Sequence, residues 1–457
     1  MSRFNPPDGR KIQAMESIKK SPLLPRVVWI PLVLGSLFLL RLFFGFYANM
    51  EFSDQFQTYL IGLKYYCTGL WPYFGLDVLD NIQLPGAMQG LLIALPLKIW
   101  PVPEAPFILL NLLSFSALCL FAWYCSKRLP DFPKWILWGW LFTAPWVMEC
   151  STNIYHVSYV LFGAVLFTIG FLETIPALTT NTVPPALANT MMGFAFCWHI
   201  QFHMSFPIQL PCLAYSAYSQ LNAHPESRMG VFLKGISFFF LGAAASGSTI
   251  LPTLVHYGTA GLGGTPNTVR FHPSNALEFF TILARYFSLA SCEVPRFLGA
   301  HTVDRLKFLS AEPWAAPFTV AAFILGILQP VTMLLSGLRQ NHPKPDWKAL
   351  RNLVFSVFLL LYFGFLFAIK LPSAHSYYVF LPLVMLYAFY VFYPWVDRPW
   401  FRRVSLVLLV CNLVFHLGLA VYNRPERSLY TYREKIAQAI QAKDYHLMGE
   451  RRANTLY

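Results

Sequence analysis

Charged residues are scarce in this sequence. Lysine, arginine, aspartate and glutamate make up 12% of the 457 residues, whereas soluble domains contain about 25%. Hydrophobic residues account for 56% and aromatic residues for 17%. This composition excludes an ordinary water-soluble domain, and several apolar runs are long enough to cross the ~30 Å hydrocarbon core of a bilayer. We therefore expect an all-α, polytopic membrane protein.

The sequence also lacks the spacings of several common functional sites. Its eight cysteines form no CxxC pair, so neither a cysteine metal cluster nor a disulfide framework is indicated. The glycine run at Gly261, Gly263 and Gly264 is not followed by the Gly-Lys-Ser/Thr of a nucleotide-binding P-loop. No convincing repeat of about 20–50 residues is present, which excludes a solenoid.

The net charge of +13 does not predict nucleic-acid binding, because there is no basic soluble domain with interleaved aromatic residues. Lysine and arginine cluster instead in loops between apolar runs, and the positive-inside rule places such loops in the cytoplasm. Residues 1–26 are polar and basic. We expect them to form a cytoplasmic segment, since the next apolar run is too long for the core of a cleavable signal peptide.

The rest of the chain divides into a polytopic domain, 27–421, and an outward-facing soluble tail, 422–457, in which Tyr432–Met448 has the pattern of one amphipathic helix. The stretch 85–101 is apolar but short, and the positive-inside rule favours an arrangement in which it does not fully cross. Outer loops are then expected at 49–104 and 257–314. About eleven spans are predicted, at 27–48, 105–126, 135–149, 155–174, 184–199, 204–220, 231–255, 315–336, 352–370, 377–396 and 403–421.

The first outer loop contains the most informative acidic residue. Ser53 is a good helix N-cap, and Asp54 follows in the first turn. Phe56 and Leu60 belong to an apolar stripe that predicts a helix on the membrane surface, with Asp54 and Thr58 away from it. The helix dipole favours ionised Asp54, which suits a base or a metal ligand. Capping of its own helix is the structural alternative.

Residues 54–128 resemble the N-terminal region of the GT-C superfamily, specifically enzymes like protein O-mannosyltransferases and lipid A aminoarabinose transferases. The resemblance rests on Asp54-Gln55, Tyr59, Trp71-Pro72-Tyr73, Gln83-Leu84-Pro85-Gly86 and Ser126-Lys127-Arg128-Leu129. The chain departs from the family pattern at Gln55, where a second acid usually stands, and in having one proline in the later turn. Glu51 is a further carboxylate one turn earlier, without an assigned role in that pattern.

This resemblance implies a glycosyltransferase that takes a sugar from a polyprenyl-phosphate donor and transfers it, with inversion, to an outward-facing lipid, glycan or protein. Asp54 is expected to be the base, and the resemblance leaves open whether it also holds a divalent cation. It further implies an inner (plasma) membrane location and an active site on the periplasmic face of the cell envelope. Glu149 lies near the usual position of a second acid; an interfacial glutamate in water is the alternative.

Other polar residues are candidates for binding the donor phosphate or sugar. His199, Gln201 and His203 lie between two apolar runs, with the two histidines one helical turn apart. A satisfied interfacial pair and a catalytic metal site are the alternatives. Arg270 and Arg296 in the second outer loop suit a phosphate clamp, or plain headgroup attraction.

The segment Lys370-Leu371-Pro372-Ser373, followed by Ala374, His375 and Tyr377-Tyr378, resembles a late segment of aminoarabinose-transferase-like enzymes, with extra residues before the tyrosines. The resemblance makes Lys370 a donor-phosphate ligand, accompanied by His375; a snorkelling interfacial lysine is the alternative.

A transporter or flippase of lipid-linked sugars is the competing function. It predicts inverted repeats and acids near the membrane midplane, whereas the acids here cluster at the predicted outer ends of the spans. One charged residue, Arg41, lies inside the first predicted span rather than at its end. We expect it to pair with a carboxylate of a neighbouring helix or to snorkel.

Overall fold

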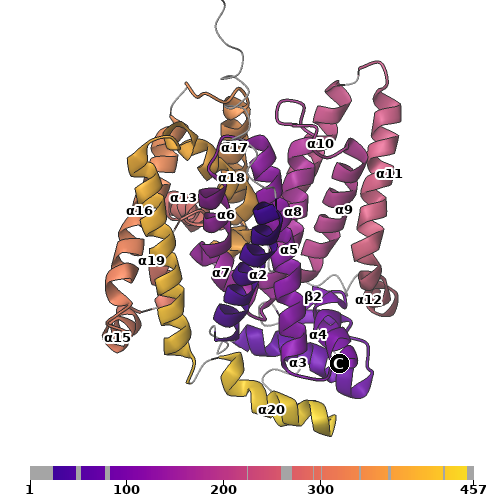
Figure 1. The fold of residues 1–457 in the computed structure, drawn as a ribbon. Helices are drawn as coiled ribbons and strands as arrows, with labels where there is room; N and C mark the ends of the chain where they lie inside the picture. Colours follow the sequence, from indigo (N-terminus) through magenta and orange to yellow (C-terminus); the bar gives the residue numbers. More distant parts are fainter. Residues whose placement is uncertain are drawn as a thin grey trace, which may run out of the picture.

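The computed structural model describes residues 24–47, 53–77, 83–223, 225–258, 270–291, 293–299, 301–338, 341–368, 372–425 and 428–449. Long apolar helices run side by side as a bundle, and shorter helices gather at one end of it (Figure 1). We call that end, which carries α3 and α4, the Asp54 end, and the opposite end the Arg128 end. The all-α, polytopic membrane fold expected from the sequence is confirmed.

The helices of the bundle overlap the predicted spans, with different bounds. They are α2 (Leu24–Phe46), α5 (Glu104–Arg128), α6 (Lys134–Thr143), α7 (Pro145–Thr152), α8 (His156–Glu173), α9 (Pro185–Phe202), α10 (Leu210–Ala223), α11 (Arg228–Gly247), α16 (Ala316–Gly337), α17 (Trp347–Phe365), α18 (Leu381–Phe392) and α19 (Pro399–Asn423). Seven segments within the described residues are long and apolar enough to cross a membrane. Full crossing by α2, by α6 with α7, by α9 and by α10 stays a prediction.

Shorter elements connect the bundle helices. At the Asp54 end these include α3 (Ser53–Thr68), α4 (Met88–Ile99), α12 (Leu251–Tyr257), α15 (Thr302–Ala311) and α20 (Leu429–Ala442) (Figure 1). The others are α13 (Phe279–Ser288), α14 (Val294–Leu298) and the 3-10 turns η2 (Phe206–Gln209), η3 (Ser248–Ile250), η6 (Pro273–Glu278), η7 (Ala374–Phe380), η8 (Tyr393–Trp395) and η9 (Tyr445–Met448).

Proline and glycine shape the bundle locally. Pro145 begins α7 after Ala144 takes an extended conformation, so the predicted span 135–149 is broken into α6 and α7. Between α9 and α11 the backbones are in close contact. A Cβ atom added at Gly193 or Gly242 would lie 1.9 Å from the carbonyl oxygen of Phe239 or Thr190 respectively. Small residues allow this approach, as is common between membrane helices.

The centre of the bundle is formed by α8 and by η7 with α18, which are buried along most of their length, whereas α11 and α16 are largely exposed and apolar. Exposed apolar helices of this kind suit a lipid environment. Arg41 on α2 is buried, and it donates to Ser151 Oγ at 2.5 Å and to the Phe142 carbonyl at 3.3 Å. It forms no ion pair within the described part of the chain, so the predicted carboxylate partner is wrong.

The first outer loop contains a small hairpin that the all-α prediction did not include. Strands β1 (Phe74–Asp77) and β2 (Gln83–Pro85) pair antiparallel. The Asp77 carboxylate accepts hydrogen bonds from Gln57 of α3 at 2.7 Å and from Gln83 at 2.5 Å. These bonds fix the hairpin to the helix that begins beside Asp54. Helix α4 follows the hairpin, and its 12 residues are too short to cross the hydrocarbon core.

Helix α3 is more enclosed than a helix on the membrane surface. Thr58, expected on the polar side, is fully buried, and its hydroxyl donates to the Asp54 carbonyl at 2.8 Å. The tail helix α20 packs on α3, with the Tyr432 ring centroid 6.0 Å from that of Phe56. The tail is therefore not free in solvent. Its helix begins at Leu429, earlier than predicted, because Ser428 caps it. It ends at Ala442, before η9, so the prediction of one helix over Tyr432–Met448 is wrong.

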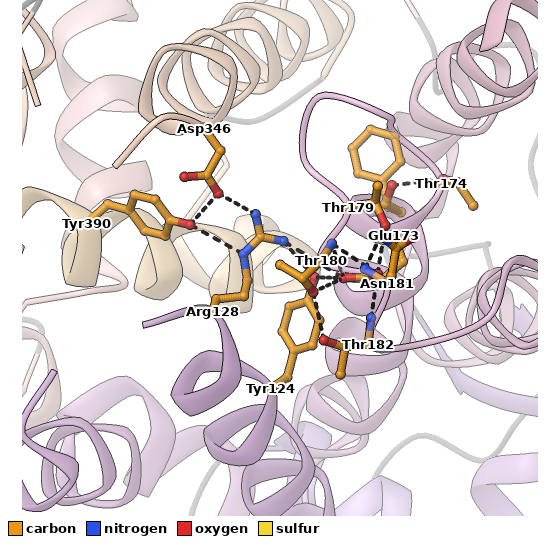
Figure 2. Close-up of polar contacts among 11 residues, drawn as sticks. Tyr124, Arg128, Glu173, Thr174, Thr179, Thr180, Asn181, Thr182, Asp346 and Tyr390 are labelled. Atoms are coloured by element: carbon orange, nitrogen blue, oxygen red, sulfur yellow. Dashed lines mark hydrogen bonds and ion pairs between the residues drawn. The ribbon is translucent and has the colours of Figure 1, made fainter. Parts of the chain in front are cut away.

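A buried network of polar side chains lies at the Arg128 end of the bundle (Figure 2). The Glu173 carboxylate at the end of α8 accepts from the hydroxyls of Tyr124 and Thr180 at 2.7 Å each, and from the hydroxyl of Thr179 at 2.9 Å. The Thr182 amide donates to it at 3.2 Å. These bonds wrap the loop after α8 around one buried acid and tie that loop to α5.

Candidate functional site

Asp54 lies in the first turn of α3, where the helix dipole favours an anionic side chain. Its close neighbour is Tyr155, in the connection between α7 and α8. Burial raises the pKa of the Tyr155 phenol, and the negative charge of Asp54 raises it further. The positive charge of Arg296 acts on the same phenol in the opposite direction. Tyr155 therefore keeps its proton and can donate a hydrogen bond, while an acid and a guanidinium lie near it.

Three histidines continue this group, which we call the Tyr155 cluster: Asp54, Tyr155, His156, His203, His375 and Arg296. The His156 ring centroid lies 4.4 Å from that of Tyr155 and 6.0 Å from that of His203. His375 lies 6.0 Å beyond His203. The histidines come from the start of α8, the end of α9 and η7, so the cluster joins segments far apart in the sequence.

The protonation of His203 follows from its hydrogen bonds. The Ser205 amide donates to His203 Nδ1 at 3.1 Å, so Nδ1 is unprotonated and the proton lies on Nε2. Burial lowers the His203 pKa to about 4. The Ser205 hydroxyl donates to the Ser376 carbonyl at 2.5 Å, which ties the end of α9 to η7. His203 is thus a neutral ring held in one orientation.

His156 differs from His203, because its Nδ1 atom is buried and has no hydrogen-bond partner. An unpaired buried polar atom costs about 1–3 kcal/mol, which a bound ligand or water can recover. Among the described histidines of the cluster, it is the one that offers a free buried hydrogen-bonding position.

Arg296 is positioned by the short helix α14. Its guanidinium carbon lies 5.3 Å from the ring centroid of Trp146, and the indole of Trp146 donates to Glu293 at 3.1 Å. Arg296 Nη2 donates to His375 Nδ1 at 3.3 Å. The residue is exposed. Arg296 thus keeps most of its donors available beside the histidines.

His199 and Gln201 are engaged within the protein. His199 is fully buried, with Nδ1 3.0 Å from Gln209 Oε1 and Nε2 3.2 Å from the Val160 carbonyl. Gln201 Nε2 donates to the Ser246 carbonyl at 2.9 Å, and its Oε1 accepts from the Thr249 hydroxyl at 2.7 Å. A direct contact of these two residues with a donor stays a prediction, and their present contacts hold α9 to its neighbours.

Glu149 faces a different part of the bundle. It lines a cavity of about 10 Å³ with Phe44 of α2 and with His416 and Leu419 of α19. This space is sufficient for about one water molecule. The contacts of Glu149 do not join it directly to the Tyr155 cluster, so its function as a second catalytic acid stays a prediction.

The remaining predicted residues are spread more widely. Arg270 is exposed and precedes His272, whose amide donates to the Leu366 carbonyl after α17 at 2.8 Å. Lys370 lies outside the described residues, as do Glu51 and the glycine run at 261–264. Their predicted functions are therefore not tested by these contacts.

Sequence reasoning missed Tyr155 and Ser205. Tyr155 is an aromatic residue in a predicted interface, and such residues are common enough that nothing singles it out. Ser205 stands two residues after a histidine, a spacing at which a serine amide and hydroxyl can reach the ring. The His203–Ser205 spacing could therefore have indicated Ser205, but a spacing of two residues is too common to single it out.

The metal alternative has limited support from the side chains present. Within the described residues, no group of three or more histidine, cysteine, aspartate or glutamate side chains is placed to hold a metal ion. Among the described residues, the Asp54 carboxylate and the Arg296 guanidinium both act on the Tyr155 phenol. Within the part of the chain that the structure describes, a divalent cation at Asp54 does not fit the donors present, and we derive no step through one.

Comparison with known proteins gives a fold relationship. No protein-family profile matches this chain, and no curated protein matches its sequence. Its structure is similar to a crystal structure of ArnT from Cupriavidus metallidurans bound to undecaprenyl phosphate, with a TM-score of 0.52 and 10% sequence identity. The match covers 89% of this chain and 77% of ArnT. The chain therefore has a fold similar to that of this ArnT structure.

Proposed function

We propose that this protein is a glycosyltransferase that moves a sugar from a polyprenyl-phosphate donor to an acceptor at the Asp54 end of the bundle. The observation that carries the proposal is the Tyr155 cluster. There an acid at a helix N-terminus, an exposed arginine and an unpartnered buried histidine nitrogen meet within a GT-C-like fold. The similar ArnT structure was obtained with undecaprenyl phosphate bound, which supports a polyprenyl-phosphate donor.

In this proposal Asp54 is the general base. The acceptor hydroxyl or amine attacks the anomeric carbon, and its proton passes to the Asp54 carboxylate. The bond between the anomeric carbon and the phosphate oxygen breaks, and its electron pair leaves with the polyprenyl phosphate. A single displacement of this kind inverts the anomeric configuration.

The leaving phosphate gains negative charge, which requires donors or cations near it. Arg296 is the best-placed cation among the described residues, since it lies beside His375 and on the face of Trp146. Guanidinium groups bind phosphate oxygens in a bidentate manner. His156 Nδ1 and His203 Nε2 are then available for sugar hydroxyls. Lys370 stays a proposed phosphate ligand on the resemblance alone.

The proposal also includes a location. The basic loops cluster at the Arg128 end, so the positive-inside rule favours a cytoplasmic Arg128 end and a periplasmic Asp54 end. The protein would then lie in the inner (plasma) membrane and act on an envelope glycan, lipid or protein.

Reconstitution in liposomes tests this function. A panel of radiolabelled polyprenyl-phosphate sugars is added with envelope extracts as acceptors, and release of free polyprenyl phosphate is measured together with label in the acceptor fraction. Consumption of one donor with transfer to an acceptor is expected. Counterflow of a lipid-linked sugar without any glycosyl transfer would instead identify a transporter or flippase.

A further inference from the structure

A cavity of about 320 Å³ lies away from the Tyr155 cluster, between α9, α10 and α11. Its walls are mainly apolar and include Phe196, Leu213 and Phe239. Two more of its lining residues, Phe232 and Phe240 on α11, are 37% and 63% exposed. The cavity is therefore a groove that opens on the lipid-facing surface of the bundle.

The arrangement of the three helices creates this groove. Gly193 and Gly242 hold α11 close against α9, as described above. Towards the Arg128 end, α11 carries the larger side chains of Phe232 and Ile236, and α10 stands beside it (Figure 1). A glycine, Gly235, lines the groove between these side chains.

The polar groups of the groove bond to the protein. Asn189 Nδ2 donates to Gln220 Oε1 at 3.0 Å and to the Pro185 carbonyl at 2.8 Å. Gln220 Nε2 donates to Asn189 Oδ1 at 3.3 Å and to Ser216 Oγ at 3.2 Å. Because all four amide hydrogens have protein acceptors, the groove offers a ligand chiefly an apolar surface, which suits a hydrocarbon chain.

The depth and charge of the groove indicate which hydrocarbon chain fits. Its α11 lining runs from Val231 to Phe240, roughly 14 Å of helix, about the hydrocarbon depth of one leaflet. Two exposed cations, Arg228 and Lys234, lie at the Arg128 end of α11, with Glu226 as the nearby acid in the chain. Neither cation forms an ion pair with another described residue.

We propose that the groove between α9, α10 and α11 binds one acyl chain of an anionic phospholipid from the leaflet at the Arg128 end, with the headgroup phosphate at Arg228 and Lys234. The apolar lining holds the chain, and the two cations select the charge of the headgroup. This site is independent of the proposed glycosyl transfer, and it acts on a membrane lipid rather than on the donor.

Native mass spectrometry of the full-length protein in detergent tests the site, with dioleoylphosphatidylglycerol and dioleoylphosphatidylcholine as probes at low salt. The wild type is expected to bind one phosphatidylglycerol in preference to phosphatidylcholine. Gly235→Leu should weaken this binding about tenfold or more, since its side chain enters the groove. A Cβ atom at Gly235 meets its nearest neighbour at 3.7 Å, so Gly235→Ala should bind normally.

Gly230 is the matched control. It lies on the same helix, does not line the groove, and a Cβ atom there meets nothing within 4 Å. Gly230→Leu should therefore bind phosphatidylglycerol like the wild type. Arg228→Gln and Lys234→Gln should each reduce the preference for the anionic lipid about fivefold, which is the attraction of one surface cation.

Unchanged binding by Gly235→Leu, or equal binding of the two phospholipids by the wild type, would overturn the proposal. So would displacement of phosphatidylglycerol by an equal concentration of undecaprenyl phosphate, which would assign the groove to a carrier lipid. Without lipid, Gly235→Leu could have a lower melting temperature than Gly235→Ala. In that case the double variant Arg228→Gln/Lys234→Gln decides whether the groove binds an anionic lipid. It keeps the groove intact and must lose the preference for phosphatidylglycerol over phosphatidylcholine.

Discussion

Arg128 at the end of α5 donates to the Asp346 carboxylate beside α17 at 2.8 Å, although the two residues are 218 positions apart in the sequence. The Tyr390 hydroxyl of α18 donates to the same carboxylate at 2.5 Å, and Arg128 Nη1 donates to the Tyr124 hydroxyl at 2.8 Å. Together with Glu173 these residues form one network (Figure 2). The network joins α5 and α8 to α17 and α18.

Arg128→Gln should therefore destabilise the protein strongly. The Arg128 side chain is fully buried, whereas that of Asp346 is 21% exposed. Removing one partner of a buried ion pair costs about 3–5 kcal/mol, and the lower end of this range is expected here. Lys127→Gln, at the exposed neighbouring position, is the control and should change stability by less than about 0.5 kcal/mol. Thermal unfolding in detergent measures both, and equal melting temperatures would contradict a stabilising role for the network.

The His203 pKa of about 4 predicts a loss of stability in acid. Between its ordinary pKa of 6.5 and about 4, the unfolded chain binds the proton and the folded protein does not. Stability from this group is complete above pH 6.5 and falls as the pH approaches 4, by up to about 3 kcal/mol. His203→Gln should show a smaller fall in melting temperature from pH 7 to pH 4 than the wild type. His446→Gln, at an exposed tail position, should behave like the wild type. A parallel fall in all three proteins would contradict the assignment.

The tail helix α20 should be required for activity through α3. Its Ile436 is fully buried, and directly after α20 the Lys443 Nζ atom lies 3.4 Å from the ring centroid of Tyr66 on α3. Ile436→Asp places a charge on the buried side of α20 and should reduce glycosyl transfer about tenfold or more by displacing α20, and with it α3 and Asp54. Lys435→Asp, on the exposed side of α20, tests for a general effect of charge and should remain active. Full activity of Ile436→Asp would show that α20 does not position α3.

Arg296→Gln should weaken donor binding. A hydrogen bond to a charged group contributes about 1.5–3 kcal/mol, so the KM for the polyprenyl-phosphate sugar should rise about tenfold or more. Lys307→Gln, at an exposed position of α15, removes a cation of the same outer loop and should leave KM unchanged. Steady-state kinetics distinguish the two. An equal KM for Arg296→Gln and the wild type would remove Arg296 from the phosphate site.

Local features of this fold were predictable from the sequence. The start of α3 at Ser53 follows from its capping pattern, and the bundle helices follow from long apolar runs. The charge balance around the apolar stretch 85–101, which contains α4, favours a segment that does not cross the membrane. These features depend on composition and spacing within a few turns, which the sequence contains.

Tertiary partners were not predictable in the same way. The sequence shows Arg128 as one of many basic residues in a predicted cytoplasmic loop, and nothing in its surroundings indicates Asp346 or Tyr390. Likewise, the spacing of His199 and His203 predicts that they share one helix face. It does not predict that His199 bonds to Gln209 while His203 stacks near His156. Such pairings depend on which helices become neighbours. The hydrophobic periodicity of the sequence does not specify which helices those are.

The most direct test of the proposed function is glycosyl transfer by Asp54→Asn. Asparagine preserves the size and the helix-capping ability of aspartate but cannot accept the acceptor's proton. Asp77→Asn is the control, since Asp77 is a second acid of the same outer loop that is bound to Gln57 and Gln83. With the consumed donor identified, Asp54→Asn should express and melt like the wild type and lose transfer by about a hundredfold or more, while Asp77→Asn stays active. Undiminished transfer by Asp54→Asn would contradict the account.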